Sequence, residues 1–204
     1  MSLHAPPAVG DQLTDISVLT SQSTRTSLSA LSGDGFLLVF VYRGCWCAFC
    51  LRRLVDFRDR INAFGRTRIR IAALSTDEPA AATRMKDRLK LPFELLCDPG
   101  AALVTSWHLQ NARDRGTARP AAVLIDATQR VRWVSQDDGY SAASVDDVLR
   151  QCAAVVRGDS LASDAPRRLR IPGVAWWLRA ARNELQFGRG ARQRGIGSPV
   201  SARR

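Results

Sequence analysis

Apolar runs and polar breaks alternate along the first 157 residues, and their spacing predicts strands and helices in turn. The apolar run at 36–42, rich in Val, Phe and Leu, predicts a buried strand. The stretch after it repeats its apolar residues with a helical period, which predicts a helix over about 48–63. Further elements are expected as a short strand or hairpin near 16–19, strands at 68–74, 92–96, 121–126 and 131–134, and helices at about 80–90, 99–107 and 144–156. This order predicts an α/β fold, a mixed central sheet with helices on both faces.

Two cysteines lie where the predicted strand gives way to the predicted helix. They are Cys47 and Cys50, directly preceded by Trp46, which we expect to shield them. The first N–H groups of a helix have no partner within it, and together with the positive end of the helix dipole they stabilise a thiolate. A free Cys ionises near pH ~8.5, and such positions lower this value. The pair is therefore predicted to carry redox chemistry.

Two structural interpretations of the same pair compete with the redox one. A zinc site needs a second Cys pair or a His pair at suitable spacing. The other cysteines, Cys45, Cys97 and Cys152, are scattered, and the histidines are His4 and His108. The two cysteines could also be small buried hydrophobes. Redox use is preferred over both, and no metal or cofactor is expected.

Length and cysteine usage suggest one domain of ordinary size with an appendage. The 204 residues contain no apolar stretch near the ~18 to 20 residues of a membrane span. The first residues lack the basic region and apolar core of a signal peptide. The expected compartment is therefore the cytoplasm, where an odd count of five cysteines argues against a structural disulfide set.

The positive charge is concentrated at the C-terminal end of the chain. Residues 158–204 hold ten Arg against three acidic residues, giving +7 of the net +11, so residues 1–157 carry only +4. We therefore predict a domain over 1–157 and a basic tail over 158–204, with an amphipathic helix at 174–187. That helix would dock on its own domain or on a second subunit, or contact an anionic membrane surface. Nucleic acid is disfavoured because no binding fold accompanies the charge.

Several motifs carry a resemblance to a known family. The segment 91–99, LPFELLCDP, is similar to that family's "LPFxLLSDP" stretch, and 123–126 is similar to its "FVID" strand. Over residues 8–157 the chain resembles the thioredoxin fold, and within it the alkyl hydroperoxide reductase C/thiol-specific antioxidant (peroxiredoxin-like) family. The resemblance implies a thioredoxin-like enzyme that reduces a hydroperoxide with electrons from an external thiol donor, such as a thioredoxin or a low-molecular-weight thiol. It also allows a homo-oligomer.

The resemblance suggests site residues, with departures from the family pattern P-x-x-x-T-x-x-C. Its final Cys, which attacks peroxide, falls on Cys50, while Cys47 replaces the Thr and Arg43 the Pro. The family's helping Arg is missing from its place, so Arg43 or Arg119 would supply the positive charge. Pro120 stands where thioredoxin-fold proteins carry a cis-proline that faces the dithiol.

The segment 43–50, RGCWCAFC, resembles a subgroup with the motif R-G-x-W-C-x-x-C, in which two patterns overlap. In the peroxiredoxin order, the Cys50 thiolate attacks the peroxide and becomes a sulfenic acid, and Cys47 then condenses with it. In the thioredoxin order, Cys47 is the nucleophile and Cys50 the resolving thiol. Peroxide reduction is the preferred function. The alternatives are thiol–disulfide exchange on a protein partner and a non-catalytic redox-sensing module, and the order of attack stays open.

Overall fold

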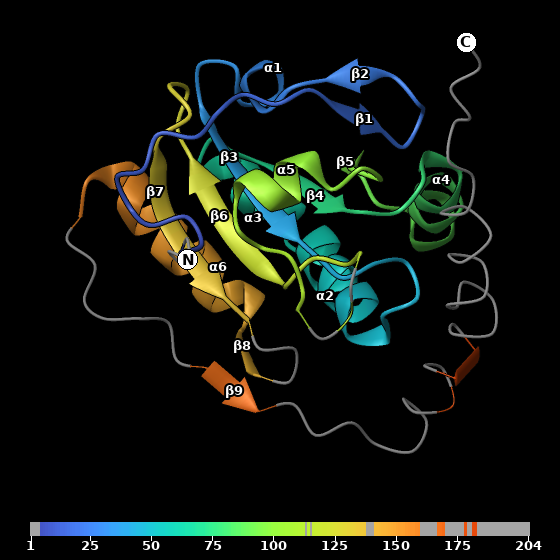
Figure 1. The fold of residues 1–204 in the computed structure, drawn as a ribbon. Coiled ribbons are helices and arrows are strands. Elements are labelled where there is room, and N and C mark those ends of the chain that lie inside the picture. Colours follow the sequence, from blue (N-terminus) through green and yellow to red (C-terminus); the bar gives the residue numbers. More distant parts are fainter. Residues whose placement is uncertain are drawn as a thin grey trace, which may run out of the picture.

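The computed structural model describes residues 5–112, 114, 116–137, 141–159, 167–169, 178, 181 and 182 (Figure 1). The strands are β1 (Val18–Thr20), β2 (Arg25–Thr26), β3 (Phe36–Val41), β4 (Ile69–Ser75), β5 (Glu94–Cys97), β6 (Ala121–Ile125), β7 (Val131–Gln136), β8 (Ser141–Ala143) and β9 (Arg167–Leu169). The helices are α1 (Leu28–Ser32), α2 (Ala48–Asp59), α3 (Ile61–Arg66), α4 (Pro79–Leu89), α5 (Ala102–Ser106) and α6 (Val145–Arg157).

Seven of the strands form one mixed sheet in the order β2-β1-β5-β4-β3-β6-β7. The centre is parallel, since β3 pairs with β4 and β4 with β5 in the same direction. The strands on either side are antiparallel: β6 pairs with β3, β7 with β6, and β1 with β5. The predicted strands at 36–42, 68–74, 92–96, 121–126 and 131–134 are all confirmed within two residues at each end.

Helices cover both faces of this sheet, as predicted. Along β3, Leu38 and Phe40 pack into a cluster shared with α2, α3, α4 and α6. Leu37 and Val39 point the other way, into a cluster shared with α1 and α5. Figure 1 shows α5 and α6 on opposite sides of the sheet. Because β3 is buried on both faces, its sequence is a continuous apolar run instead of an alternating one.

The helix predicted over 48–63 is interrupted at Arg60. That residue has φ −110° and ψ 5°, which ends α2, and α3 begins at the next residue. Its guanidinium donates to the Asp146 carboxylate at the start of α6, at 2.6 Å. The sequence analysis also missed α1, a short helix that Ser27 caps by accepting the N–H of Ala30 at 3.3 Å.

One strand of the structure lies within the segment predicted to be a tail. Strand β9 pairs antiparallel with β8, with Arg167 opposite Ala143. Of the helix predicted at 174–187, residues 178, 181 and 182 are described; all three are helical and exposed, and the rest of that prediction lies outside the described residues. No helix in the described part of the chain is both long and apolar enough to cross a membrane.

Candidate active site: the Cys47–Cys50 dithiol

The dithiol lies at the junction that the sequence predicts. Strand β3 ends at Val41, a short loop follows, and Cys47 is the N-cap of α2, with extended backbone at φ −77° and ψ 102°. Its Sγ accepts the backbone N–H of Cys50 at 3.4 Å. The sulfur thus takes the place that a Ser or Asp oxygen fills at an ordinary helix start. The expected contact between a cysteine sulfur and the unpaired N–H groups of a helix is confirmed.

The two thiols differ in how easily they ionise. A hydrogen bond from the Cys50 thiol lowers the pKa of Cys47 below its ordinary value, although burial opposes this. The backbone N–H groups of Cys50 and Phe49 and the charge of Arg43 lower that pKa further. For Cys50, burial raises the pKa well above its usual range, and the neighbouring Cys47 adds to the rise. The negative charge of the pair therefore belongs on Cys47, with the proton on Cys50.

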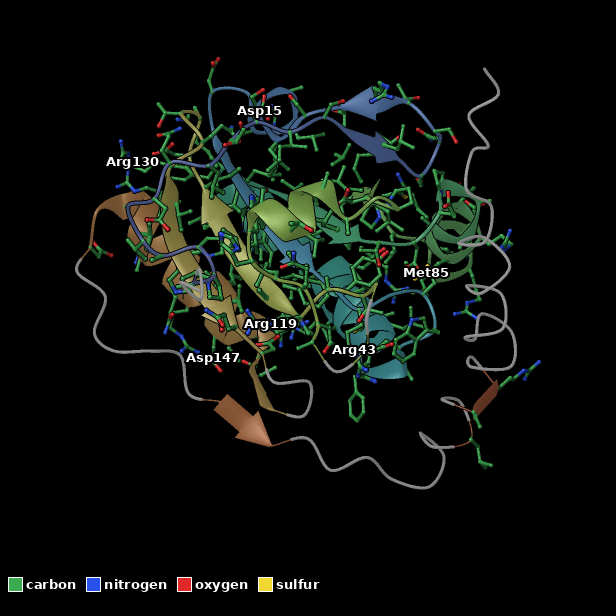
Figure 2. All side chains as sticks on the ribbon, viewed as in Figure 1. Asp15, Arg43, Met85, Arg119, Arg130 and Asp147 are labelled. Carbon is green, nitrogen blue, oxygen red and sulfur yellow. The ribbon has the colours of Figure 1, made fainter. Side chains whose placement is uncertain are left out.

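Arg43 and Trp46 flank the pair. The Arg43 guanidinium carbon lies 4.8 Å from the centroid of the Trp46 ring, a cation–π arrangement. The same guanidinium pairs with the Asp114 carboxylate at 3.7 Å, and Figure 2 shows Arg43 beside the start of α2. Trp46 itself is buried. The structure thus brings Arg43, Trp46 and the two cysteines together.

Arg119 and Pro120 have hydrogen-bond partners that the sequence did not reveal. The exposed Arg119 guanidinium donates to the backbone carbonyl of His108 at 2.7 Å, which holds its charge there. The prediction of a cis-proline at Pro120 is wrong, because none of the peptide bonds among the described residues is cis. The Pro120 carbonyl instead accepts the N–H of Asp137 at 3.0 Å and extends the pairing of β6 with β7. Pro120 is thus a strand-start residue, in the trans form that an X–Pro bond favours by ~0.5–1 kcal/mol.

A buried arginine that the sequence analysis did not single out lies one turn beyond the dithiol. Arg53 donates to the carbonyl of Ala143 in β8, and its guanidinium lies 3.7 Å from the Asp137 carboxylate. Its charge also stacks 5.6 Å from the ring centroid of Phe40. Position 53 is three residues after Cys50, on the buried face of α2, which is the signal that could have marked it. Arg53 anchors the dithiol helix to the end of β7 and to β8.

The other three cysteines are buried and stay protonated. All five cysteines are free thiols in the structure. Burial raises the pKa of Cys97 to about 12, with the Asp77 carboxylate contributing. Burial also raises the pKa of Cys45 and Cys152 far above the ordinary value. Within the described residues, no three His, Cys, Asp or Glu side chains gather as a metal site.

Comparison with known proteins decides the family. The sequence profile of the AhpC/TSA family matches residues 9–134, well over half of the chain. The chain belongs to the AhpC/TSA family. It is therefore an enzyme, a thiol-dependent oxidoreductase of the peroxiredoxin kind that reduces peroxides, and the family resemblance drawn from its motifs is confirmed.

The relatives cover most of the chain at low identity. A candidate peroxiredoxin of Mycobacterium tuberculosis, Rv1608c, is 22% identical over 152 residues, which are 73% of this chain and 98% of that protein. The crystal structure of the peroxidoxin BcpB from the same organism superposes with a TM-score of 0.67 at 20% identity, covering 78% of this chain and 100% of the other. Mycobacterium tuberculosis AhpC gives a TM-score of 0.67 at 22% identity, over 79% and 99% of the two chains. These structures share the thioredoxin-like fold described above.

Proposed function

We propose that this enzyme reduces hydroperoxides through the Cys47–Cys50 dithiol, with Cys47 as the attacking thiolate and Cys50 as the resolving thiol. The observation that carries the proposal is the hydrogen bonding of the Cys47 sulfur, which accepts from the helix N–H of Cys50 at 3.4 Å. Its pKa is lowered while that of Cys50 is raised. Since the thiolate is the nucleophile, the sulfur that holds the charge attacks first.

The pair supplies both electrons for the reaction and one of the two protons, and solvent supplies the other. The Cys47 thiolate attacks one peroxide oxygen, so that an S–O bond forms while the O–O bond breaks and an alkoxide leaves. The alkoxide takes a proton, and the Cys50 thiol is the nearest sulfur that still carries one. The Cys50 thiolate that this leaves attacks the Cys47 sulfenic acid, so that the S–S bond forms and the S–O bond breaks. The hydroxide that leaves takes a proton from solvent and becomes water. Two electrons from an external thiol donor, a thioredoxin or a low-molecular-weight thiol, restore both thiols.

The order of attack differs from the one that the family's sequence pattern implies, in which Cys50 reacts first. A pair of serine variants separates the two. After one equivalent of hydrogen peroxide, Cys50→Ser should trap a sulfenic acid on Cys47, and Cys47→Ser should lose the rapid reaction. A sulfenic acid that forms on Cys50 in Cys47→Ser at the native rate would reverse the roles.

Thiol–disulfide exchange on a protein partner is the second candidate, because the same Cys47 thiolate would attack a disulfide. Only 5% of Cys47 is exposed, which favours a small substrate over a folded protein. Peroxide consumption and insulin-type disulfide reduction, measured on one preparation, compare the two activities. A faster insulin reaction would make exchange the main function.

We further propose a cytoplasmic setting and self-association. A reducing compartment suits a chain with five free thiols, and it supplies the electron donor that the cycle needs. Sedimentation of the reduced and the oxidised enzyme tests the self-association.

A further inference from the structure

A buried carboxylate lies on the other side of the loop that carries the dithiol. Asp77 follows β4, and β3 and β4 run parallel, so the ends of both strands meet at the same edge of the sheet. Its Oδ2 accepts the backbone N–H of Cys45 at 2.8 Å and the hydroxyl of Ser75 at 2.9 Å. The Asp77 N–H donates back to the Ser75 oxygen at 3.3 Å. Asp77 thus ties the loop between β3 and α2 to the end of β4.

This loop carries two cysteines, Cys45 and Cys47, that are separated by a single residue. Cys45 and Cys47 are both buried, at 1% and 5% exposure, so exposure does not separate them. Their partners do: the Cys47 sulfur meets the helix N–H groups and the charge of Arg43, while Cys45 meets the Asp77 carboxylate.

A third cysteine belongs to the same neighbourhood. Cys97 ends β5 and lies opposite Ser75 in β4. Ser75 is the residue whose hydroxyl donates to Asp77. The charged groups that act on Cys97 are Asp77 and Glu78. A negative charge disfavours a second negative charge close to it, so a carboxylate here opposes a thiolate on either cysteine.

We propose that Asp77 is a specificity-determining residue: its hydrogen bond fixes the backbone at Cys45, and its charge adds to burial in disfavouring a thiolate on Cys45 and Cys97, so that oxidation stays on the Cys47–Cys50 pair. This inference rests on the proposed function of that pair. Without the carboxylate, a Cys45 thiolate could attack the Cys47 sulfenic acid, so that an S–S bond forms, the S–O bond breaks and the hydroxide that leaves takes a proton from solvent. The product would be a disulfide other than Cys47–Cys50.

The direction of the ionisation supports this role. Burial raises the pKa of Cys45 far above its ordinary value, and the Asp77 carboxylate raises it further. The buried Tyr42 lies in the same group, and the pKa of its hydroxyl is raised by burial and by the neighbouring Cys45 and Asp77. Tyr42 and Cys97, the other acids that act on Cys45, thus have raised pKa values as well.

The test replaces the charge and keeps the shape. Asp77→Asn can still accept the Cys45 N–H through its amide oxygen, and Glu78→Gln removes the same charge from the adjacent exposed position. The reduced full-length proteins are alkylated with iodoacetamide, and each cysteine is quantified by peptide mass mapping. We expect Asp77→Asn to raise the labelling of Cys45 relative to Cys152 several-fold, and Glu78→Gln to leave that ratio unchanged.

Cys152 serves as the internal reference, because burial alone raises its pKa and a general loosening of the fold would raise its labelling as well. After one equivalent of hydrogen peroxide, Asp77→Asn should also yield a disulfide that contains Cys45. The inference is wrong if Asp77→Asn gives the same Cys45 to Cys152 labelling ratio and the same disulfides as the native protein. If the oxidised native protein forms a disulfide other than Cys47–Cys50, the proposed function fails. The disulfide map of the native protein reveals this without any variant.

If Asp77→Asn does not fold, the native protein can still overturn the inference. As the pH rises, labelling of Cys47 should saturate first, while labelling of Cys45 should lag behind a free cysteine peptide measured alongside. Labelling of Cys45 that follows Cys47 at every pH would overturn the inference.

Discussion

The first turn of α2 and the middle of α6 each bury a cysteine, and the two thiols are opposite in character. Cys47 is 5% exposed and Cys152 is fully buried, and both pack in the same apolar cluster. Yet the pKa of Cys47 is lowered, first by the hydrogen bond from Cys50, while burial alone raises the pKa of Cys152. Burial does not decide which thiol reacts.

The difference comes from the place of each residue on its helix. In the middle of a helix every backbone N–H is bonded to the carbonyl four residues earlier, so none is left for a sulfur. At the helix start the N–H groups are open, and the dipole favours negative charge. Cys47 has this position and an arginine beside it, whereas Cys152 lies seven residues into α6 among apolar side chains.

The largest expected effect is on activity. Cys47→Ser should reduce peroxide consumption to the background rate, because a serine hydroxyl stays protonated at neutral pH and cannot replace the thiolate. Cys152→Ser should keep the native rate per folded molecule. Steady-state peroxide consumption with excess thiol donor checks both variants, and a dead Cys152→Ser enzyme that is fully folded would break the comparison.

The same two variants should show the reverse order in stability. Serine is a preferred N-cap, so Cys47→Ser should change the free energy of unfolding by no more than ~0.5 kcal/mol. In α6 the new hydroxyl is buried in an apolar cluster, and Cys152→Ser should lose about 1–3 kcal/mol. Urea unfolding of the reduced proteins measures both changes. Equal losses of unfolding free energy in the two variants would mean that the position of the cysteine on its helix does not determine the cost of replacing it.

A smaller effect is expected when the charge beside Cys47 is removed. Because the pKa of Cys47 is lowered, its thiolate forms at a lower pH than that of an ordinary cysteine, and it is lost as the pH falls through that pKa. Arg43→Met should move this loss to higher pH and slow the alkylation of Cys47 at pH 7 by up to about tenfold. Arg52→Met is the matched control, since Arg52 lies on α2 but is exposed and paired with Asp56. The pH profile of Cys47 alkylation distinguishes the two variants. If the profiles of Arg43→Met and Arg52→Met coincide, Arg43 does not influence the ionisation of Cys47.

Local features of the sequence predicted most of the fold and the reactive pair. The apolar run of β3 is a strand because both its faces are covered, and the residues after Cys47 form a helix because their apolar positions repeat with a helical period. These two facts alone place Cys47 at a helix start. Its hydrogen bond to the N–H three residues later follows from ordinary capping geometry.

The features that sequence analysis missed depend on residues far apart in the chain. Arg53 is buried because Asp137 and Ala143, more than 80 positions later, meet it at the end of β7 and in β8. The carbonyl of Pro120 pairs with the N–H of Asp137, a partner that no local pattern reveals. Strand β9 likewise has a distant partner, because it pairs with β8.

The smallest expected effect concerns the basic tail, which meets the domain close to α2. Strand β9 pairs with β8, and the Ala143 carbonyl of β8 accepts from Arg53, one turn beyond Cys50. A chain ending at Arg157 loses β9 but keeps the seven-stranded sheet, α2 and α6, so it should fold and retain peroxide reduction. We expect a loss of no more than ~1 kcal/mol, because a short two-stranded pair contributes little.

A chain ending at residue 170 is the matched control, since it keeps β9 and removes the rest of the tail. Urea unfolding and peroxide consumption of both chains test the effect of β9, and sedimentation with and without anionic vesicles tests whether residues beyond 170 govern association. If the chain ending at Arg157 fails to fold and the chain ending at 170 is native, β9 belongs to the core and the domain boundary moves beyond it. If the shorter chain folds but its Cys47 alkylates more slowly, the tail acts on the dithiol through Ala143 and Arg53. In that case the reactivity of Cys47 depends on a partner outside α2. It depends as well on its position at the start of a helix, which Cys152 lacks.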